Sequence, residues 1–232
     1  SRIKDQTPVM VVIGNPPYSS SSSNKSQWIQ GLIADYKKDL NERKINLDDD
    51  YIKFIRFGQH FIDKNESGVL AHISSNSFID GITHRQMRKH LLESFDDIYI
   101  LDLHGNAKKK ETAPDGSPDQ NVFDIMQGVS INLFVKTGKK DKTALATVHH
   151  HELQGKRTDK YAFLNENDLS GIPWEILLTT IPEYLFISKN IEGESIYKKG
   201  FGVCELFTIC SSGVETQNDG ELISLQEFDS VH

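Results

Sequence analysis

The stretch VMVVIGNPPY, residues 9–18, decides the fold prediction. Val9–Ile13 is a short, continuous apolar run rich in β-branched residues, and the Gly14-Asn15-Pro16-Pro17 sequence ends it. Such a run predicts a buried, parallel strand followed by a rigid turn. Each proline fixes its own φ and biases the residue before it towards an extended conformation. The strand therefore presents Asn15 and Tyr18 at its carboxyl end, where open α/β sheets bind their ligands.

Segments with helical and strand periodicity alternate after this turn. Further strands are expected over 69–73, 98–103, 129–135 and 145–149. Helices are expected over 28–40, 50–62, 85–94 and 174–190, with a turn over 76–81 and a loop after about residue 156. The strand over 129–135 is predicted to be antiparallel to the one over 98–103. This order predicts an α/β fold with a mixed sheet that ends in an antiparallel strand pair.

The composition describes an ordinary globular chain of 232 residues with a net charge of −7, from 26 basic and 33 acidic residues. No apolar run is long enough to span a membrane, and two cysteines cannot build a disulfide framework, so we expect a cytoplasmic protein. Residues 201–232 hold six acidic side chains and no Lys or Arg, which leaves the first 200 residues close to neutral. Three clusters are candidates for a locally basic surface, although ordinary solvated side chains are the better explanation for each cluster alone: Arg85, Arg88 and Lys89; Lys108–Lys110; and Lys139, Lys140 and Lys142.

The Asn15-Pro16-Pro17-Tyr18 sequence has the chemistry to bind a planar amino group. The Asn side chain offers a carbonyl acceptor, and prolines leave backbone carbonyls without competing N–H donors nearby. Tyr18 adds a face on which a planar ring can stack. The alternative is a proline-rich turn with a buried tyrosine, which needs no ligand.

The chain resembles the γ-type N6-adenine DNA methyltransferases of single-polypeptide restriction-modification enzymes, in which a methyltransferase is fused to nuclease and helicase parts. The NPPY motif carries the resemblance, together with segments 50–62, 68–81, 98–106 and 121–136 in the order of that family's motifs. The resemblance implies the C-terminal half of a Rossmann-like domain that depends on S-adenosylmethionine. It also implies a site-specific enzyme that methylates the N6 amino group of an adenine flipped out of double-stranded DNA.

The resemblance assigns roles to individual residues. The Asn15 side chain and the Pro16 carbonyl would accept hydrogen bonds from the adenine amino group, with Pro17 completing the rigid turn. Tyr18 would stack on the base, and Phe123 would pack on it from a second side. Core packing is an equally good explanation for Phe123. No metal site is expected, because consecutive histidines such as His149–His151 point to opposite faces of a strand.

One departure from the family concerns the cofactor. A Gly-rich loop after a strand is absent, and Gly200-Phe201-Gly202 follows no strand, so we interpret it as a turn. Cofactor-binding residues therefore stay unassigned. We expect a fragment that lacks the N-terminal cofactor motif and is inactive alone. Residues 1–200 would be the C-terminal part of the catalytic domain and 201–232 the start of a target-recognition domain.

Two other classes of function remain open. One is methylation of another planar amine or amide, such as an RNA base or the glutamine of a release factor. The other is a DNA-binding module without catalytic activity. The partners expected for the leading interpretation are double-stranded DNA and nuclease or helicase parts of the same polypeptide or complex. A half-sheet should also expose an apolar edge or face.

Overall fold

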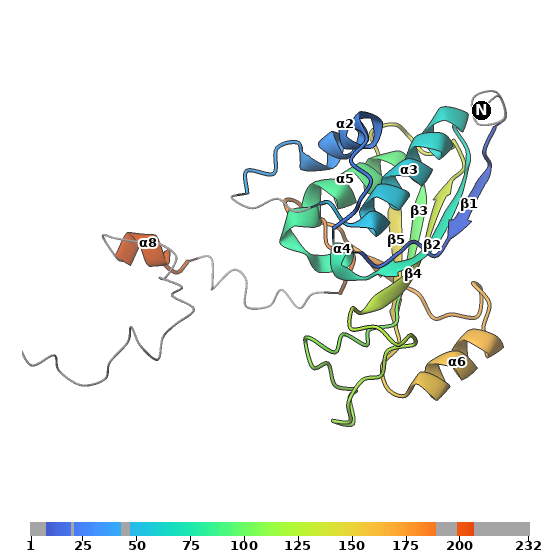
Figure 1. The fold of residues 1–232 in the computed structure, drawn as a ribbon, viewed down its shortest axis with the longest axis vertical. Helices are drawn as coiled ribbons and strands as arrows, with labels where there is room; N and C mark the ends of the chain where they lie inside the picture. Colours follow the sequence, from blue (N-terminus) through green and yellow to red (C-terminus); the bar gives the residue numbers. More distant parts are fainter. Residues whose placement is uncertain (1–7, 20, 43–46, 189–198, 207–232) are drawn as a thin grey trace, which may run out of the picture. The chain divides into compact units, whose positions relative to one another are not determined.

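The computed structural model describes residues 8–19, 21–42, 47–188 and 199–206. Its centre is one six-stranded mixed sheet with the strand order β1-β2-β4-β3-β5-β6 (Figure 1). The strands are β1 (Val11–Gly14), β2 (Gly68–Ser75), β3 (Asp97–Asp102), β4 (Val129–Lys136), β5 (Thr147–Glu152) and β6 (Glu175–Leu177). The predicted α/β fold with a mixed sheet is confirmed, and β4 is antiparallel to β3 as expected.

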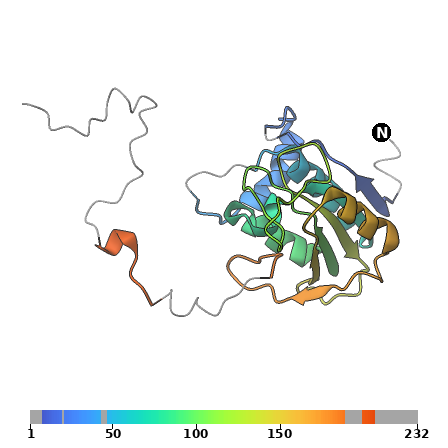
Figure 2. The same ribbon diagram turned by 90° about the horizontal axis from the view of Figure 1, so that it is seen from below.

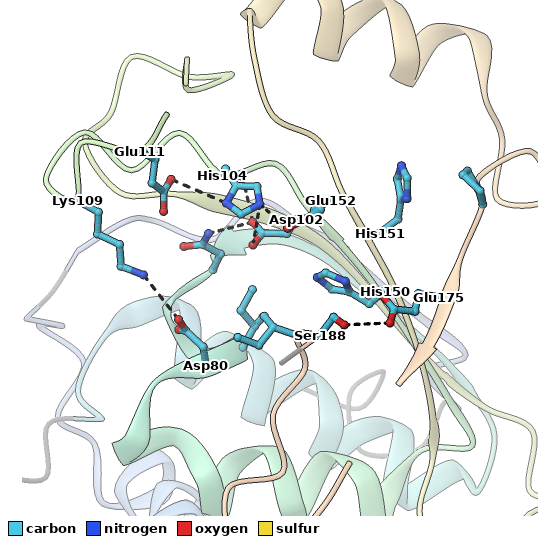
Figure 3. Close-up of a pocket in the computed structure, with 14 residues that line it drawn as sticks. Asp80, Asp102, His104, Lys109, Glu111, His150, His151, Glu152, Glu175 and Ser188 are labelled. Carbon is cyan, nitrogen blue, oxygen red and sulfur yellow. Dashed lines mark hydrogen bonds and ion pairs between the residues drawn. The ribbon is translucent and has the colours of Figure 1, made fainter. Parts of the chain in front are cut away.

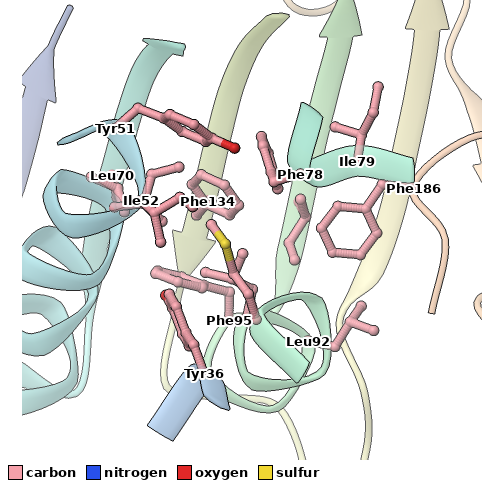
Figure 4. Close-up of a cluster of buried hydrophobic side chains, with 14 of the residues drawn as sticks. Tyr36, Tyr51, Ile52, Leu70, Phe78, Ile79, Leu92, Phe95, Phe134 and Phe186 are labelled. Carbon is pink, nitrogen blue, oxygen red and sulfur yellow. The ribbon is translucent and has the colours of Figure 1, made fainter. Parts of the chain in front are cut away.

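Four helices and a 3-10 turn cover one face of this sheet (Figures 1 and 2). They are α2 (Gln27–Lys37), α3 (Asp50–Asn65), α4 (Ser77–Asp80), the 3-10 turn η1 (Ile82–His84) and α5 (Arg85–Ser94). Their apolar sides and the sheet enclose the main core, in which Tyr36, Tyr51, Phe78 and Phe134 are fully buried (Figure 4). Burying aromatic and aliphatic side chains in this way is the principal source of stability for the layer.

The sheet register brings the functional side chains to one edge. β1 is parallel to β2, and β3 is parallel to β5, while β4 lies antiparallel between β2 and β3. The carboxyl ends of β1, β2, β3 and β5 therefore meet at the same edge of the sheet, beside the amino end of β4. Open α/β sheets bind ligands at this edge.

The segment between β3 and β4 and helix α6 (Arg157–Glu166) lie beyond this edge (Figure 1). A second apolar cluster joins them to the strand ends, with Leu101, Leu103, Val122 and Val129 buried at its centre. The sequence predicted only a loop after residue 156, so α6 was missed. The reason is that Lys160 is the one buried residue of this helix, which leaves no apolar stripe to detect.

Strand β1 is less buried than its sequence predicted. Among the described strands it pairs with β2 alone, and Val11 and Ile13 are 62% and 81% exposed. The prediction of a buried strand is therefore wrong for this chain, whereas the parallel pairing and the exposed apolar edge are confirmed. An apolar run reports which side chains could be buried, but the strand's neighbours decide whether they are.

The second half of the chain brings further corrections. The helix predicted over 174–190 is wrong, because β6 and a series of turns occupy residues 174–188. Pro173 and Pro182 lack an N–H donor, which disfavours a helix there. The turn over 76–81 contains the short helix α4, and the strand predicted over 145–149 lies at Thr147–Glu152. Arg88, expected on the surface, is fully buried.

Residues 189–232 form a separate unit, of which the structure describes only 199–206 with the four-residue helix α8 (Val203–Leu206). Most of the segment predicted to begin a target-recognition domain lies outside the described residues. Within the described part, the Gly200-Phe201-Gly202 sequence precedes α8 and follows no strand. No helix in the described ranges has the length and apolar character to cross a membrane.

Candidate active site

The NPPY motif lies directly after β1, at the carboxyl edge of the sheet. Pro16 is buried, whereas Asn15 and Pro17 are exposed and Tyr18 is partly buried. The buried proline anchors the turn, and it leaves the amide of Asn15 at the surface. An exposed acceptor on a fixed backbone is suited to receive a ligand's hydrogen-bond donor.

Tyr18 forms part of the wall of a cavity of about 320 Å³. This volume lies at the lower end of the ~300–1,000 Å³ that is typical of ligand pockets. Every residue of the wall carries a polar group in its side chain, and Asn15 is not part of the wall. Its members are Tyr18, Ser19, Asp49, Tyr51, Ser75, Ser77, Asn106, Lys108, Lys109 and Gln127.

The Tyr18 ring is packed on one side and open to this cavity on the other. Its centroid lies 6.3 Å from that of Phe123, with an angle of 56° between the planes. The Tyr18 hydroxyl is buried without a hydrogen-bond partner. Burial raises the pKa of Tyr18 to about 12, so the phenol stays neutral at physiological pH. The hydroxyl is therefore an unused donor behind the cavity wall, and the residue meets the cavity through its ring.

Asp49 contributes a carboxyl group to the same cavity. It precedes α3 as the N-cap residue, but its side chain makes no capping hydrogen bond. Burial raises its pKa to about 6, and the neighbouring charges of Asp48 and Asp50 add to the effect. This carboxyl group therefore changes charge near neutral pH, which is common at functional sites.

The end of β2 and the loop after it contribute Ser75 and Ser77 to the wall of the cavity, and hydrogen bonds hold this segment in place. The Ser75 and Ser77 hydroxyls lie 3.0 Å apart. Between them, the buried Asn76 donates from Nδ2 to Oδ1 of Asp102 at 2.9 Å, and its N–H donates to the carbonyl of Gly128 at 3.0 Å. A side chain at residue 128 would collide with Asn76, since a Cβ there would lie 2.7 Å from Oδ1. The structure thus places this serine-rich loop in the wall of the cavity.

The loop after β3 also lines the cavity and carries the Lys108–Lys110 cluster. Asn106 Oδ1 accepts hydrogen bonds from the N–H groups of Lys108 and Lys109, each at 3.1 Å. Glu111 in turn accepts the N–H of Asn106 at 2.7 Å. These bonds fix the backbone of the loop and leave the lysine side chains exposed.

A larger cavity of about 410 Å³ lies next to the first one, at the ends of β3 and β5 (Figure 3). Asp102 accepts the N–H of His104 at 3.0 Å, and His104 Nε2 lies 3.0 Å from Glu152. His150 also lines this cavity and is only 4% exposed, with no partner for Nε2. No group of side chains in the described part of the chain has the arrangement of a metal site.

The neighbouring histidines have structural contacts. His149 stacks on Tyr99 with centroids 4.3 Å apart, and His151 stacks on Phe163 at 5.6 Å.

Of the predicted site residues, the structure brings the rings of Tyr18 and Phe123 together, and Asn15 lies outside the cavity wall. The sequence missed Asp49 as a cavity residue, because an acidic residue before a helix has an adequate explanation in the helix dipole.

Comparisons with known proteins agree with this geometry. Residues 5–108 match the model of the Eco57I restriction-modification methylase family. No curated protein matches the sequence.

Solved structures extend the similarity to most of the chain. The ATP-dependent Type ISP restriction-modification enzyme LlaBIII bound to DNA is 28% identical, with a TM-score of 0.71 over 83% of this chain and 13% of that one. A DrdV–DNA complex is also 28% identical, with a TM-score of 0.66 over 78% of this chain and 18% of that one. The Type ISP enzyme LlaGI, at 23% identity and a TM-score of 0.69, shares the fold over 84% of this chain and 19% of that one.

The expected resemblance to methyltransferases of restriction-modification systems is confirmed at this level. The matches do not specify adenine or any other target. The chain spans less than a fifth of the length of these solved structures. The activity of a whole enzyme of this kind is therefore a proposal for this chain.

The described residues do not fit S-adenosylmethionine as a complete site. None of the described strands is followed by a Gly-rich turn that leads into a helix, which is the usual cradle for a cofactor of this kind. Only the backbone near Asn15 lies at the appropriate strand end. The chemistry that these residues can supply therefore concerns the group that would be methylated, and not the methyl donor.

Proposed function

We propose that this protein provides the target-base site of a restriction-modification methyltransferase that transfers a methyl group from S-adenosylmethionine to the N6 amino group of an adenine in DNA. The observation that carries the proposal is the position of Asn15-Pro16-Pro17-Tyr18, at a strand end beside a polar cavity that Tyr18 lines. The similarity to restriction-modification enzymes bound to DNA supports duplex DNA as the substrate.

The acceptor groups explain how an unreactive amine could be prepared. The lone pair of an adenine amino group is delocalised into the ring, which makes N6 a poor nucleophile. The Asn15 side-chain carbonyl and the Pro16 backbone carbonyl would accept hydrogen bonds from its two N–H groups. Both bonds favour a tetrahedral nitrogen whose lone pair is localised. Preorganised acceptors of this kind need no reorganisation when charge develops. A general base is not needed before the attack.

The aromatic pair explains how the base could be held outside the duplex. Extruding a base costs a few kcal/mol, and stacking on an aromatic ring recovers ~1–3 kcal/mol. Tyr18 and Phe123 are too close and too tilted to hold a base between them, because a sandwich needs parallel rings about 7 Å apart. We therefore expect the base to stack on Tyr18 first and Phe123 to move when it packs on the other face.

The test is methylation of duplex DNA by the protein as its gene encodes it, with N6-methyladenine measured in digested DNA by mass spectrometry. Tyr18→Ala should lower kcat/KM by roughly 5- to 150-fold, the equivalent of ~1–3 kcal/mol, while Tyr18→Phe keeps most activity. Asn15→Ala should be worse than Tyr18→Ala, since it removes an acceptor for the reacting amino group.

Controls distinguish misfolding from loss of chemistry. Thermal melting of Asn15→Ala and Tyr18→Phe should match the parent protein, because Asn15 is exposed and the Tyr18 hydroxyl donates no hydrogen bond. Tyr18→Ala loses packing on the second apolar cluster and should melt lower while it remains folded. If folded Tyr18→Phe were as inactive as Tyr18→Ala, the hydroxyl would be the working group and stacking would be wrong. Methylation of RNA or of a protein glutamine, but not of DNA, would overturn the proposed substrate.

A further inference from the structure

We propose that Lys108 and Lys109 bind the DNA phosphates beside the extruded nucleotide, and that the carboxylates of the larger cavity confine the DNA strand to the Tyr18 side of their loop. The inference rests on the proposed function and adds to it the surface along which the DNA runs. The loop that carries both lysines forms part of the wall of each cavity, so its two sides can be compared directly.

The two lysines are placed to meet a polyanion at the cavity that holds Tyr18. Both line that cavity, and both are exposed. Lys108 has no carboxylate within 4.0 Å among the described residues, and the Lys109 ammonium lies 3.7 Å from Asp80 in a pair that is 57% and 40% exposed. Asp80 lines the larger cavity, so the Lys109 ammonium points to that side in this structure. An exposed pair of this kind is worth little, so a phosphate on the Tyr18 side can take its place.

The loop is also preorganised. Asn106 holds the backbone N–H groups of both lysines, and Glu111 holds the N–H of Asn106. Glu111 lies 3.9 Å from His104 Nδ1, and the N–H of His104 donates to Asp102, which also accepts from Asn76. These contacts connect the loop of Lys108 and Lys109 to Asn76, which lies between the cavity residues Ser75 and Ser77. Ordering before binding reduces the entropic cost of each phosphate contact.

The other side of the loop has the opposite charge (Figure 3). Five carboxylates line the larger cavity, and Lys109 is its only Lys or Arg. They are Asp80, Asp102, Glu111, Glu152 and Glu175. The Tyr18 cavity has two lysines and one carboxyl group, Asp49, so a phosphate would be repelled from the larger cavity and attracted on the Tyr18 side. The change of sign across one loop gives the DNA strand a defined path past Tyr18.

The decisive experiment compares two pairs of lysines in the protein as its gene encodes it. The test variant is Lys108→Gln/Lys109→Gln. The matched control is Lys139→Gln/Lys142→Gln, which removes two exposed lysines that follow the carboxyl end of β4, at the opposite edge of the sheet. Binding to a duplex oligonucleotide is measured by fluorescence anisotropy between 50 and 200 mM salt.

Each phosphate contact contributes about 0.9 to the slope of log K against log salt concentration. The test variant should therefore lower the magnitude of this slope by about 1.8 and weaken binding at 50 mM salt, whereas the control should keep the parent slope. Equal losses in both variants would mean a general charge effect and would overturn the proposal. An unchanged slope in the test variant would overturn it as well.

A third variant tests the acidic boundary. Glu152→Gln keeps an acceptor for His104 and removes one charge, so it should tighten DNA binding by about twofold at 50 mM salt. No change, or weaker binding, would refute the boundary. Methylation assays separate the two proposals: if the parent protein methylates adenine but the test variant binds DNA normally, only the lysine contacts are wrong. If the slopes change as expected but no adenine is methylated, only the proposed reaction is wrong.

Discussion

Lys160→Met is expected to destabilise the protein strongly, because Lys160 and Asp119 form a buried ion pair. Their side chains are 1% and 0% exposed, and Lys160 Nζ lies 3.0 Å from Asp119 Oδ2. The ammonium group also donates to the carbonyls of Leu103 and Gln120, both at 2.7 Å. The pair therefore joins α6, the end of β3 and the segment that leads to Phe123.

The magnitude follows from what the substitution leaves behind. Methionine fills a similar length with an apolar chain, but it leaves the Asp119 carboxylate and two carbonyls buried without their donor. Removing one partner of a buried pair costs ~3–5 kcal/mol. A protein of this size loses about 2–4 °C of Tm per kcal/mol, so we expect Tm to fall by about 6–20 °C.

Urea and thermal unfolding of the purified protein provide the assay. Lys156→Met is the control, because this lysine is exposed four residues earlier and should change stability by no more than about 0.5 kcal/mol. Asp119→Asn keeps an acceptor for the Gly155 N–H. Its combination with Lys160→Met should be less harmful than the sum of the single variants, by ~0.5–3 kcal/mol. A loss below about 1 kcal/mol for Lys160→Met alone would refute the reasoning.

Arg88→Met should lower the free energy of unfolding in urea by ~3–5 kcal/mol, because the buried guanidinium donates to four backbone carbonyls. Arg88→Lys should not restore this stability, since only the planar guanidinium reaches all four carbonyls. Asp49→Asn should raise Tm more at pH 8 than at pH 4.5. The pKa of about 6 lies above the ordinary 3.8, so the folded state binds this proton more tightly; stability is lost as pH rises from 3.8 to 6, and the loss is complete above pH 6. His72 and His84 act in the opposite direction, since burial lowers each pKa to about 4. The unfolded state then binds more protons, so stability should be lost as pH falls from 6.5 to 4. Replacing both histidines with Gln should flatten this part of the stability profile. An unchanged profile would contradict the lowered pKa of both histidines. Ile13→Lys should reduce self-association measured by light scattering, because it places a charge on the exposed edge strand β1. An unchanged association state would show that copies of the protein do not associate through this edge.

The sequence predicted those elements whose signal is local. The apolar run of β1 ends in prolines, α3 begins after a run of acidic residues, and β4 alternates apolar and polar side chains. Each pattern lies within one segment, and the periodicity of the backbone converts it directly into a strand or a helix. The NPPY motif is also contiguous, so its position at a strand end could be predicted before any neighbour was known.

Tertiary structure alone decided where most of the polar side chains lie. Nothing near Lys160 in the sequence distinguishes it from an exposed lysine, and its partner Asp119 lies 41 residues away. In the sequence, Arg88 resembles its surface neighbour Lys89. The carbonyls that accept hydrogen bonds from its buried guanidinium belong to residues 78, 81, 183 and 184. Burial of a charge depends on whether distant groups can satisfy it, and no local pattern contains that information.

The candidate site divides in the same way. The sequence by itself determined that Asn15 and Tyr18 follow a strand on a rigid turn, because proline restricts φ wherever it stands. It did not determine that Asp49, Ser75 and Lys109 surround Tyr18. Those residues belong to segments that meet only because parallel strands end at a common edge, and strand order is fixed by packing between distant parts of the chain.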